Sequence, residues 1–554
     1  MSYEKYKRYP GVNLQDRQWP SRQIEHAPVW CSVDLRDGNQ ALPVPMNVDE
    51  KLKMFKLLVD MGFKEIEVGF PSASHTEHTF IRRLIEEDLI PEDVTIQVLT
   101  QSRDHLIEKT FEALKGVKNA IVHLYNSTST LQRRVVFGKS KEEIVDIAVH
   151  GAELFNELRE KYDETNFTFE YSPESFTGTE LDYALEICEA VLKVWKPTPE
   201  RKAIINLPGT VEMATPNVYA DQIEWFCRSL SDRESVIVSL HTHNDRGTCT
   251  AASELGLLAG ADRIEGTLFG NGERTGNLDI VTTGMNLYSQ GIDPKLDFSN
   301  ITNIIQVYEE CTKLTVHDRH PYAGKLVYAA FSGSHQDAIR KGLIAMKEEN
   351  NPYWEVPYLA IDPHDVGREY EEIIRINSQS GKGGTAYIME SEFGFFLPKA
   401  MHAEFGSLVK DKSDSLGTEL LPEQIFELFK QEYLYKKQPY KLRSYEIKSV
   451  QDVETDINTV NIRATVSVNG VDKNIEGIGN GPVDAFFNAL HHNNINGCKF
   501  ISYDEHALEL GSESRAVCYI QIENEGRRCF GVGVSENIDT ASLNALISAL
   551  NRCK

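Results

Sequence analysis

The pair His241 and His243 offers two imidazole side chains, separated by one residue, at the end of an apolar run. Residues two apart in a β-strand project from the same face, so both imidazoles can point in one direction. Two neutral imidazoles suit a divalent transition metal, and a carboxylate would complete the ligand set. The competing interpretation is a histidine pair satisfied within a core, and the pair alone favours the metal only slightly.

Asp37 is the candidate for that carboxylate, and it lies within Asp34–Gln40, directly after the first predicted strand. In a closed barrel the first strand adjoins the eighth and lies one strand from the seventh, so Asp37 can reach the histidines. Arg36 beside it would supply a fixed cation for a carbonyl or enolate oxygen. A solvated turn with Gly38 at positive φ is a good alternative for Asp37 taken alone.

Two glycine-rich runs resemble phosphate-binding motifs without matching them. Gly270–Asn277 has the wrong spacing for a dinucleotide fingerprint and closes an alternating series instead of opening one. Gly381–Thr385 fails the P-loop pattern, because its Lys is not followed by Ser or Thr. Either run could be a turn, but the first follows the eighth predicted strand and is the stronger functional candidate.

Short β-rich runs alternate with longer helical patterns over about the first 270 residues. The strands are predicted at Val29–Asp34, Lys64–Gly69, Val94–Leu99, Asn119–Leu124, Phe167–Tyr171, Ala203–Leu207, Val236–His241 and Arg263–Thr267. Eight alternations favour an α/β chain that begins with a closed (β/α)8 TIM barrel, although alternation alone also fits a doubly wound open sheet.

Polar side chains fall at the strand ends, which surround the active site in barrels of this kind. They are Glu65, Glu67, His123, Tyr125, Ser172, Glu174, Asn206 and Thr210. Singly, each is more typical of structural hydrogen bonding than of catalysis, and Glu65 and Glu67 are interpreted as barrel-lining structure. Together they predict a polar mouth.

The sequence divides into three parts: a barrel with an N-terminal arm (1–300), connecting subdomains (301–435) and a C-terminal domain (436–554). The connecting part has one clear helix, Gln336–Glu348, and an irregular stretch that includes the charged run Lys410–Leu416. In the C-terminal part, 477–490 and 531–546 are similar, which predicts a duplicated β-β-β-α unit of α+β type. Two Gly-rich helix starts would leave backbone N–H groups for a ligand.

Composition excludes several classes of protein. The formal net charge of −25 over 554 residues argues against nucleic-acid binding and against an anionic membrane surface. Nine dispersed cysteines without a C-x-x-C pair fit a reducing compartment. No apolar run approaches the ~18 residues of a membrane span, and the N-terminus lacks a signal-peptide core. We therefore expect a cytoplasmic location.

Two motifs carry a family resemblance. Leu35–Gln40, followed by Lys51, resembles the first signature of the 2-isopropylmalate and homocitrate synthases, and Leu240–Gly247 resembles the second. Cys249 stands where the family has Gly, Ala or Ser. The resemblance continues through the Gly-rich loop, Ala330–Asp337, Asn377–Gly384 and the duplicated domain, so it covers nearly the whole chain.

The resemblance implies a metal held by Asp37, His241, His243 and Asn277, with Mg²⁺ favoured and Mn²⁺ or Zn²⁺ as alternatives. It implies that a 2-oxo acid chelates this metal, that Arg36 stabilises the developing alkoxide and that Glu174 is catalytic. The implied substrate-binding residues are Leu99, His123, Tyr125, Ser172, Asn206, Pro208, Thr210 and Glu273. The implied reaction condenses acetyl-CoA with 3-methyl-2-oxobutanoate.

The long form of the family also implies roles outside the barrel. His335 and Tyr358 match the residues that act on acetyl-CoA, and the family's interlocked homodimer is expected. Leucine is the implied inhibitor, and residues 479–483 (Gly479, Asn480, Gly481, Pro482 and Val483) form its candidate site, with Val483, Phe486 and Phe487 as apolar positions behind it.

Other functions remain open on the sequence alone. A homocitrate or citramalate synthase differs only in the 2-oxo acid; a second carboxylate would need a further cation, which we do not find among the implied pocket residues. A His-x-His barrel hydrolase would carry its pair early in the chain, and an amino-acid sensor would not need the metal residues.

Overall fold

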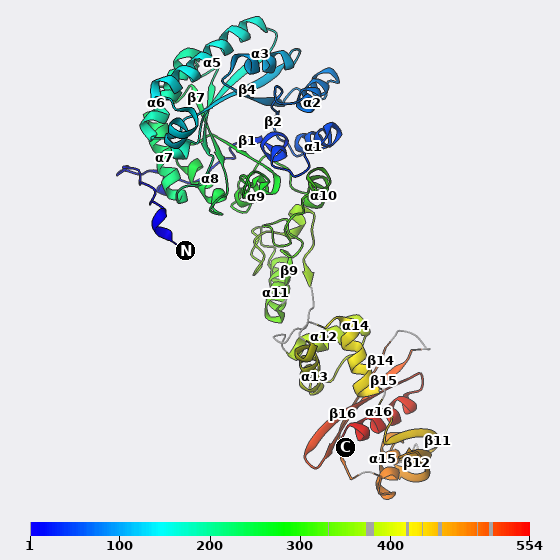
Figure 1. The fold of residues 1–554 in the computed structure, drawn as a ribbon. Coiled ribbons are helices and arrows are strands. Elements are labelled where there is room, and N and C mark those ends of the chain that lie inside the picture. The colour runs from blue at the N-terminus through cyan, green and yellow to red at the C-terminus, as the bar shows by residue number, and fades with distance from the viewer. Residues whose placement is uncertain are drawn as a thin grey trace. The chain divides into compact units, whose positions relative to one another are not determined.

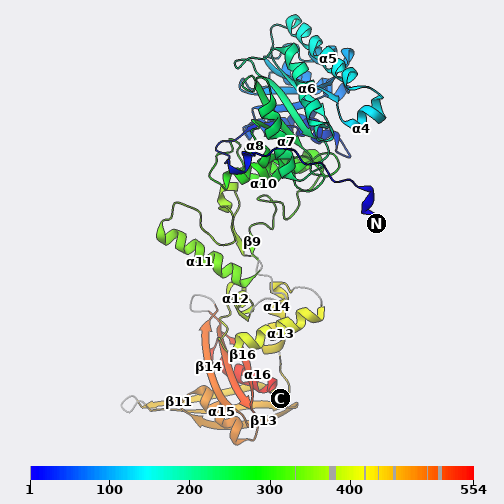
Figure 2. The ribbon, with the colours of Figure 1, turned by 90° about the vertical axis from the view of Figure 1, so that its left-hand side faces the viewer.

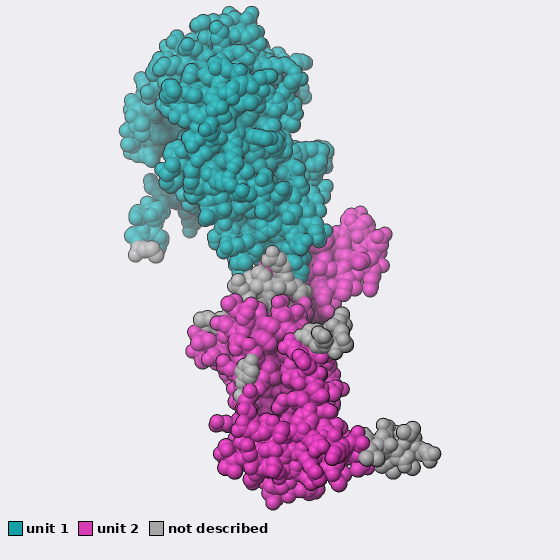
Figure 3. Space-filling view, turned by 90° about the vertical axis from the view of Figure 1, so that its right-hand side faces the viewer, with its two compact units in different colours: residues 1–328, 359–370 teal, residues 329–358, 371–554 magenta. Residues whose placement is uncertain are grey.

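The computed structural model describes residues 2–330, 332–372, 382–416, 420–434, 436–452, 457–495, 497–508 and 514–553. They form two compact units (Figure 3). Unit 1 comprises residues 1–328 and 359–370, and unit 2 comprises residues 329–358 and 371–554. Each unit is described separately below.

Unit 1 is a closed barrel of eight parallel strands that follow one another in chain order (Figure 1). The strands are β1 (Val29–Ser32), β2 (Glu65–Gly69), β3 (Thr95–Gln101), β4 (Asn119–Ser127), β5 (Asn166–Glu174), β6 (Ala203–Gly209), β7 (Val236–Thr242) and β8 (Arg263–Gly266). The barrel closes where β1 pairs with β8, with Ser32 opposite Gly266. The predicted (β/α)8 barrel is confirmed, and each predicted strand has its counterpart.

Helices cover the outside of the barrel and alternate with its strands (Figure 1). They are α1 (Val48–Asp60), α2 (His75–Glu86), α3 (Asp104–Ala113), α5 (Lys141–Lys161), α6 (Leu181–Trp195), α7 (Pro216–Ser229) and α8 (Cys249–Leu258), followed by α9 (Ile280–Tyr288) and α10 (Ile301–Thr312). Helix α1 begins with a capping box, in which Asn47 and Glu50 satisfy each other's backbone N–H groups.

Unit 2 begins with helix α11 (Gly333–Glu349) and a two-stranded sheet of β9 (Ala329–Ala330) and β10 (Glu371–Glu372). Three helices follow: α12 (Lys382–Phe393), α13 (Met401–Leu416) and α14 (Pro422–Phe429). The prediction that Lys410–Leu416 lies in an irregular stretch is wrong, because these residues form the end of α13. Met401, Phe405 and Val409 repeat every four residues and are fully buried, and this packing fixes the helix.

The C-terminal part of unit 2 contains the predicted duplication (Figure 2). The first copy is β11 (Tyr440–Asp452), β12 (Ile457–Val468), β13 (Val471–Gly479) and α15 (Pro482–His492). The second is β14 (Lys499–Ala507), β15 (Ala516–Asn524), β16 (Arg527–Ser535) and α16 (Ile538–Arg552). The two copies share one hydrophobic core, so each copy buries its apolar side chains against the other.

The glycines of the repeat serve close packing of helix on strand. A Cβ at Gly477 would lie 2.5 Å from the Ala485 carbonyl oxygen, and one at Gly531 would lie 2.1 Å from the Ala549 nitrogen. No larger residue fits at these strand positions without moving the helix. Within the described residues, no helix is long and apolar enough to cross a membrane.

Candidate active site

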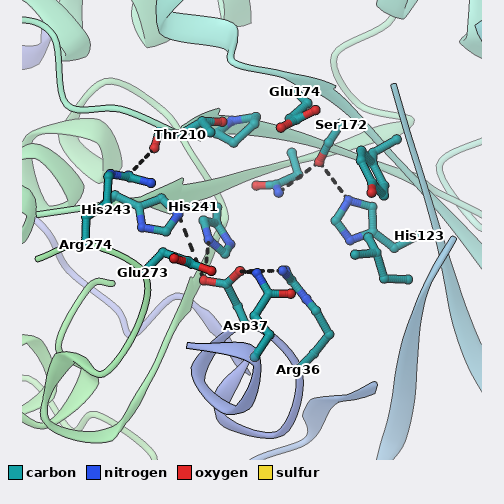
Figure 4. Close-up of a pocket in the computed structure, with 15 residues that line it drawn as sticks. Arg36, Asp37, His123, Ser172, Glu174, Thr210, His241, His243, Glu273 and Arg274 are labelled. Atoms are coloured by element: carbon teal, nitrogen blue, oxygen red, sulfur yellow. Dashed lines mark hydrogen bonds and ion pairs between the residues drawn. The ribbon is translucent and has the colours of Figure 1, made fainter. Parts of the chain in front are cut away.

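A cavity of about 270 Å³ opens at the carboxyl ends of the barrel strands (Figure 4). Its walls include all of the predicted substrate-binding residues together with most of the predicted metal and catalytic residues of the barrel. They are Arg36, Asp37, Gln40, Leu99, His123, Tyr125, Ser172, Glu174, Asn206, Pro208, Thr210, His241, His243, Glu273 and Arg274. Residues that are scattered over about 240 positions of sequence therefore share one small space.

Asp37 and the two histidines converge in this cavity. The chain leaves β1 through a π-helical turn, Asp34–Gly38, which brings Asp37 beneath the end of β7. Asp37 Oδ2 lies 3.8 Å from His241 Nε2 and 3.9 Å from His243 Nε2 (Figure 4). All three side chains are buried. A carboxylate and two imidazole nitrogens that face one point form a set suited to a divalent metal.

Asn277 joins this group from the loop after β8. Its Nδ2 donates to Asp37 Oδ2 over 2.7 Å and to the Asn271 carbonyl over 3.0 Å. Its Oδ1 is buried and has no hydrogen-bond partner among the described residues. An unpaired buried amide oxygen beside a carboxylate and two imidazoles fits a bound cation. The residues present therefore suit the implied metal.

The charges of the group depend on one another. Burial opposes ionisation of Asp37, but Arg36 and His241 outweigh it and lower the pKa of Asp37 well below its ordinary value. Burial also opposes protonation of His241, yet the negative charge of the nearby Asp37 and the hydrogen bond to Glu265 raise its pKa to about 9. Burial and the neighbouring His241 lower the pKa of His243 to about 4. Asp37 is thus a permanent anion, as a metal ligand must be.

Arg36 is fixed between two carboxylates. Its Nε donates to Glu67 Oε2 and its Nη1 donates to Asp37 Oδ1, each over 2.5 Å. Glu67 is fully buried and lines the barrel, as predicted, and it also orients the guanidinium. An arginine held at both ends presents its charge to the cavity without reorganisation.

Hydrogen bonds also order the wall opposite the metal group. His123 Nε2 lies 2.7 Å from Ser172 Oγ, and Ser172 Oγ accepts a hydrogen bond from Asn206 Nδ2 over 3.0 Å. The Thr210 hydroxyl accepts the Ser175 N–H over 3.0 Å, and its proton remains available to a ligand. Glu174 accepts a hydrogen bond from Ser127 at the end of β4.

Sequence reasoning did not select two cavity residues, Gln40 and Arg274. Arg274 has a left-handed backbone, with φ of 57°, and belongs to the Gly-rich loop. Its Nε donates to Asp245 Oδ1 over 2.6 Å, and its Nη2 donates to the Thr210 carbonyl over 2.5 Å. This cation is committed to its neighbours. Its place between two glycines of a loop at the barrel mouth was the signal that could have identified it.

His335 and Tyr358 belong to unit 2 and are absent from the walls of this cavity. Their rings stack, with centroids 4.0 Å apart and planes inclined by 25°. Both residues are exposed, and Tyr358 has a left-handed backbone with φ of 65°. The stretch Asn377–Gly384 lies outside the described residues, apart from its last three residues at the start of α12.

The predicted ligand loop, 479–483, joins β13 to α15. Gly481 is the N-cap of α15, no side chain caps the helix there, and a Cβ at Gly481 would meet open space. The second copy differs, because Asn537 caps α16 by accepting the Thr540 N–H. The start of α15 therefore lacks, among the described residues, the side-chain cap that satisfies one N–H group at the start of α16. Phe486 is fully buried in the core, so it is not an open apolar surface behind the loop.

The fold and this cavity define a barrel enzyme whose site is built to hold a divalent metal. Three family models match the chain: HMGL-like at residues 27–307, alpha-isopropylmalate synthase post-catalytic domain-like at 325–390, and LeuA allosteric (dimerisation) domain at 419–554.

Relatives match the chain over its full length. The 2-isopropylmalate synthase of Clostridium acetobutylicum is 71% identical, with 100% of both chains covered. That of Acetoanaerobium sticklandii is 58% identical, with 100% of this chain and 97% of the relative covered. That of Rhodospirillum rubrum is 55% identical, with 99% and 98% covered. The chain belongs to the 2-isopropylmalate synthase family, as the sequence motifs predicted.

Proposed function

We propose that this protein condenses acetyl-CoA with 3-methyl-2-oxobutanoate and hydrolyses the resulting thioester with water, which releases (2S)-2-isopropylmalate and CoA, the first committed step of leucine biosynthesis. The enzyme is then an acyltransferase that converts the acyl group into an alkyl group on transfer. The convergence of Asp37, His241 and His243 at the barrel mouth carries this proposal. Full-length relatives that are 54–71% identical and share one name support it.

Asp37, His241, His243 and Asn277 would hold the metal, with Mg²⁺ favoured over Mn²⁺ or Zn²⁺. When bound, the metal supplies Lewis acidity at the 2-oxo group of the substrate. Two imidazoles, one carboxylate and one amide leave coordination positions for two substrate oxygens. The unpaired Oδ1 of Asn277 and the anionic Asp37 support this assignment.

Three residues around the cavity would act on the substrates directly. Arg36 presents a fixed positive charge where the alkoxide develops, which preorganises the site for the transition state. The Thr210 hydroxyl donates a hydrogen bond to the substrate carboxylate. Glu174 accepts a proton from the water that attacks the thioester.

Acetyl-CoA must lose a methyl proton before it can attack. We assign this step to His335 and Tyr358 on the strength of the family resemblance, and their ring stacking makes them one structural pair. The family's interlocked homodimer would bring this pair to the barrel of the partner subunit. The match of residues 419–554 to a dimerisation domain supports a dimer.

Leu99 is the apolar wall of the cavity that suits an isopropyl group. A second substrate carboxylate, as in homocitrate formation, would need a further cation, but Arg274 is already paired with Asp245. A panel of 2-oxo acids assayed for CoA release tests the function. Kcat/KM should be highest with 3-methyl-2-oxobutanoate, and a preference for pyruvate or 2-oxoglutarate would overturn the assignment.

Leucine would inhibit the enzyme from the C-terminal domain. The match to an allosteric domain supports regulation, and the uncapped start of α15 supports a carboxylate site at residues 480–483. Asp484 already accepts the Asn480 N–H over 2.9 Å, and Pro482 has no N–H, so the N–H groups left for leucine in the first helical turn are those of Val483 and Asp484. Val483 and Phe487 are partly buried and would border the side chain.

A further inference from the structure

Below the cavity, the interior of the barrel contains a layer of buried charged groups that the proposed reaction does not use. Among the described residues, Arg263 is the largest side chain that is fully buried, and Glu170, Glu265 and Gln97 are buried around it. Charged groups are almost never fully buried unless they are paired, so this layer must have a structural or functional reason.

Glu265 connects this layer to the metal group. The parallel register places Glu265 on β8 directly beside His241 on β7. Its Oε2 lies 2.7 Å from His241 Nδ1, and both side chains are buried. A carboxylate only accepts hydrogen bonds, so His241 must carry its proton on Nδ1. When His241 is neutral, as a metal-binding imidazole must be, its lone pair then resides on Nε2, the atom that faces Asp37.

Several strands hold Glu265 in place. Arg263 Nη1 donates to its Oε1 over 2.8 Å, and Gln97 Nε2 donates to the same oxygen over 3.2 Å. Asn206 Nδ2 donates to Oε2 over 3.3 Å. Donors from β3, β6 and β8 therefore fix both oxygens of the carboxylate. A group fixed from three sides imposes its own orientation on the imidazole it contacts.

The second imidazole has no such support. His243 Nδ1 is buried, and within the part of the chain that the structure describes it has no hydrogen-bond partner. The two histidines are thus unequal, although they share a strand end and a direction. Glu265 fixes the tautomer of His241, whereas no described residue bonds Nδ1 of His243 to fix its tautomer.

We propose that Glu265 is a positioning residue for the metal: by holding His241 as an Nε2 ligand, it sets the affinity of the site for a divalent ion. This inference rests on the metal site of the proposed function. Carboxylates that orient a metal-binding histidine typically change metal affinity 10–100-fold when they are removed. Arg263 serves the same end indirectly, because it holds Glu265.

A second metal within the layer is the alternative. His123, Glu170 and Glu265 bring three donor atoms within 4.8 Å of one another. However, Arg263 Nη1 lies 2.8 Å from Glu265 Oε1 and 3.5 Å from Glu170 Oε2, so a fixed cation already faces both carboxylates. Burial and the proximity of Glu265 also raise the pKa of Glu170 well above its ordinary value. A buried carboxyl whose ionisation is opposed and which lies beside a guanidinium is a poor metal ligand.

The test replaces Glu265 with Gln and uses Glu65→Gln as its matched control. Glu65 Oε2 accepts from Arg263 Nε over 2.5 Å, so both variants take one carboxylate from the same arginine. Of these two glutamates, Glu265 is the one that contacts His241. The probe is Co²⁺, added to the metal-free full-length protein and followed by calorimetry and by its visible absorption.

We expect Glu265→Gln to weaken Co²⁺ binding 10–100-fold, and Glu65→Gln to change it less than about twofold, while the melting temperatures of both metal-free variants fall. Equal Co²⁺ affinity in Glu265→Gln and the wild type would overturn the proposal, and so would equal weakening in both variants. If Glu265→Gln does not fold, Glu265→Asp replaces it in the test. The shorter carboxylate keeps a negative charge beside Arg263 but moves away from His241. CoA release by the wild type with 3-methyl-2-oxobutanoate tests the proposed function separately.

Discussion

Asp37 and Asn277 are separated by 240 positions in the chain and are joined by a hydrogen bond of 2.7 Å between Asn277 Nδ2 and Asp37 Oδ2. The bond links the turn after β1 to the loop after β8. The same Asp37 oxygen faces both histidines at 3.8 and 3.9 Å. Closure of the barrel between β1 and β8 is what brings these loops together.

Asp37→Asn should abolish metal binding and CoA release, and excess substrate should not restore them. The change removes the one anion that faces both imidazoles and places a second amide against Asn277. Metal content after dialysis and the rate of CoA release measure the effect. Chelation of the wild type should give the same loss. Asp34→Asn, in the same turn, is the control and should retain its metal. Full activity in verified metal-free protein would refute the metal-dependent mechanism.

Asp34→Asn should make the barrel more stable at pH 8 and leave its stability at pH 4 nearly unchanged. Burial raises the pKa of Asp34 to about 7. Between pH ~4 and 7 the folded state therefore holds a proton that the unfolded state has released, and stability falls as pH rises. The wild type loses up to about 4 kcal/mol across this range, whereas Asn cannot ionise.

Melting temperatures of the two proteins across this pH range measure the difference. The hydrogen bonds permit the substitution, because an Asn oxygen can accept the Leu268 N–H and its NH2 can donate to Ser32 Oγ. Parallel curves for wild type and variant would show that Asp34 does not titrate in this range.

The sequence sufficed for the barrel because its signals are local and repeated. Eight β-rich runs separated by helical patterns define the barrel, and strand ends then predict which side chains face the mouth. The sequence alone therefore groups Asp37 with His241 and His243. Helix α13 was not predicted because its C-terminal end is a charged run, although Met401, Phe405 and Val409 carry a helical periodicity.

The charged layer inside the barrel could not be predicted in the same way. Arg263 and Glu265 alternate with apolar residues on β8, a pattern that equally fits a solvated strand face. Whether that face points into the barrel depends on strand tilt and on partners such as Gln97, which lies on β3. Such pairing is a property of the closed structure and not of any single segment.

His335→Phe should lower kcat by about 10²–10⁴-fold and leave the KM for 3-methyl-2-oxobutanoate nearly unchanged, because general acid–base catalysis is worth that much. Phenylalanine keeps the ring that stacks on Tyr358 at 4.0 Å but cannot transfer a proton. His335→Ala is the companion variant. If the histidine only packs, Phe should restore the activity that Ala loses, and a loss under roughly threefold in both would exclude a catalytic role.

The proposed interlocked dimer makes a separate prediction. Mixing inactive Asp37→Asn protein with inactive His335→Phe protein should restore partial activity, because a mixed dimer contains one intact barrel and one intact partner pair. Subunit exchange must be verified, for instance by native mass spectrometry of the mixture. Mixed dimers without activity would place both residues of each site in the same subunit.

Gly481→Asp should remove leucine inhibition without changing CoA release in the absence of leucine. The variant puts a like charge at the start of α15, where the leucine carboxylate is proposed to bind, and a Cβ there meets open space. Gly497→Asp is the matched control, since a Cβ at Gly497 is equally unobstructed. In the wild type and the control, leucine should act with a coupling energy of about 1–3 kcal/mol, or roughly 5–150-fold. Leucine titrations of the CoA-release rate and of leucine binding measure both effects. Retained inhibition in a folded Gly481→Asp protein would place the leucine site elsewhere, and lost inhibition in both variants would show that added charge, not its position, disturbs the domain.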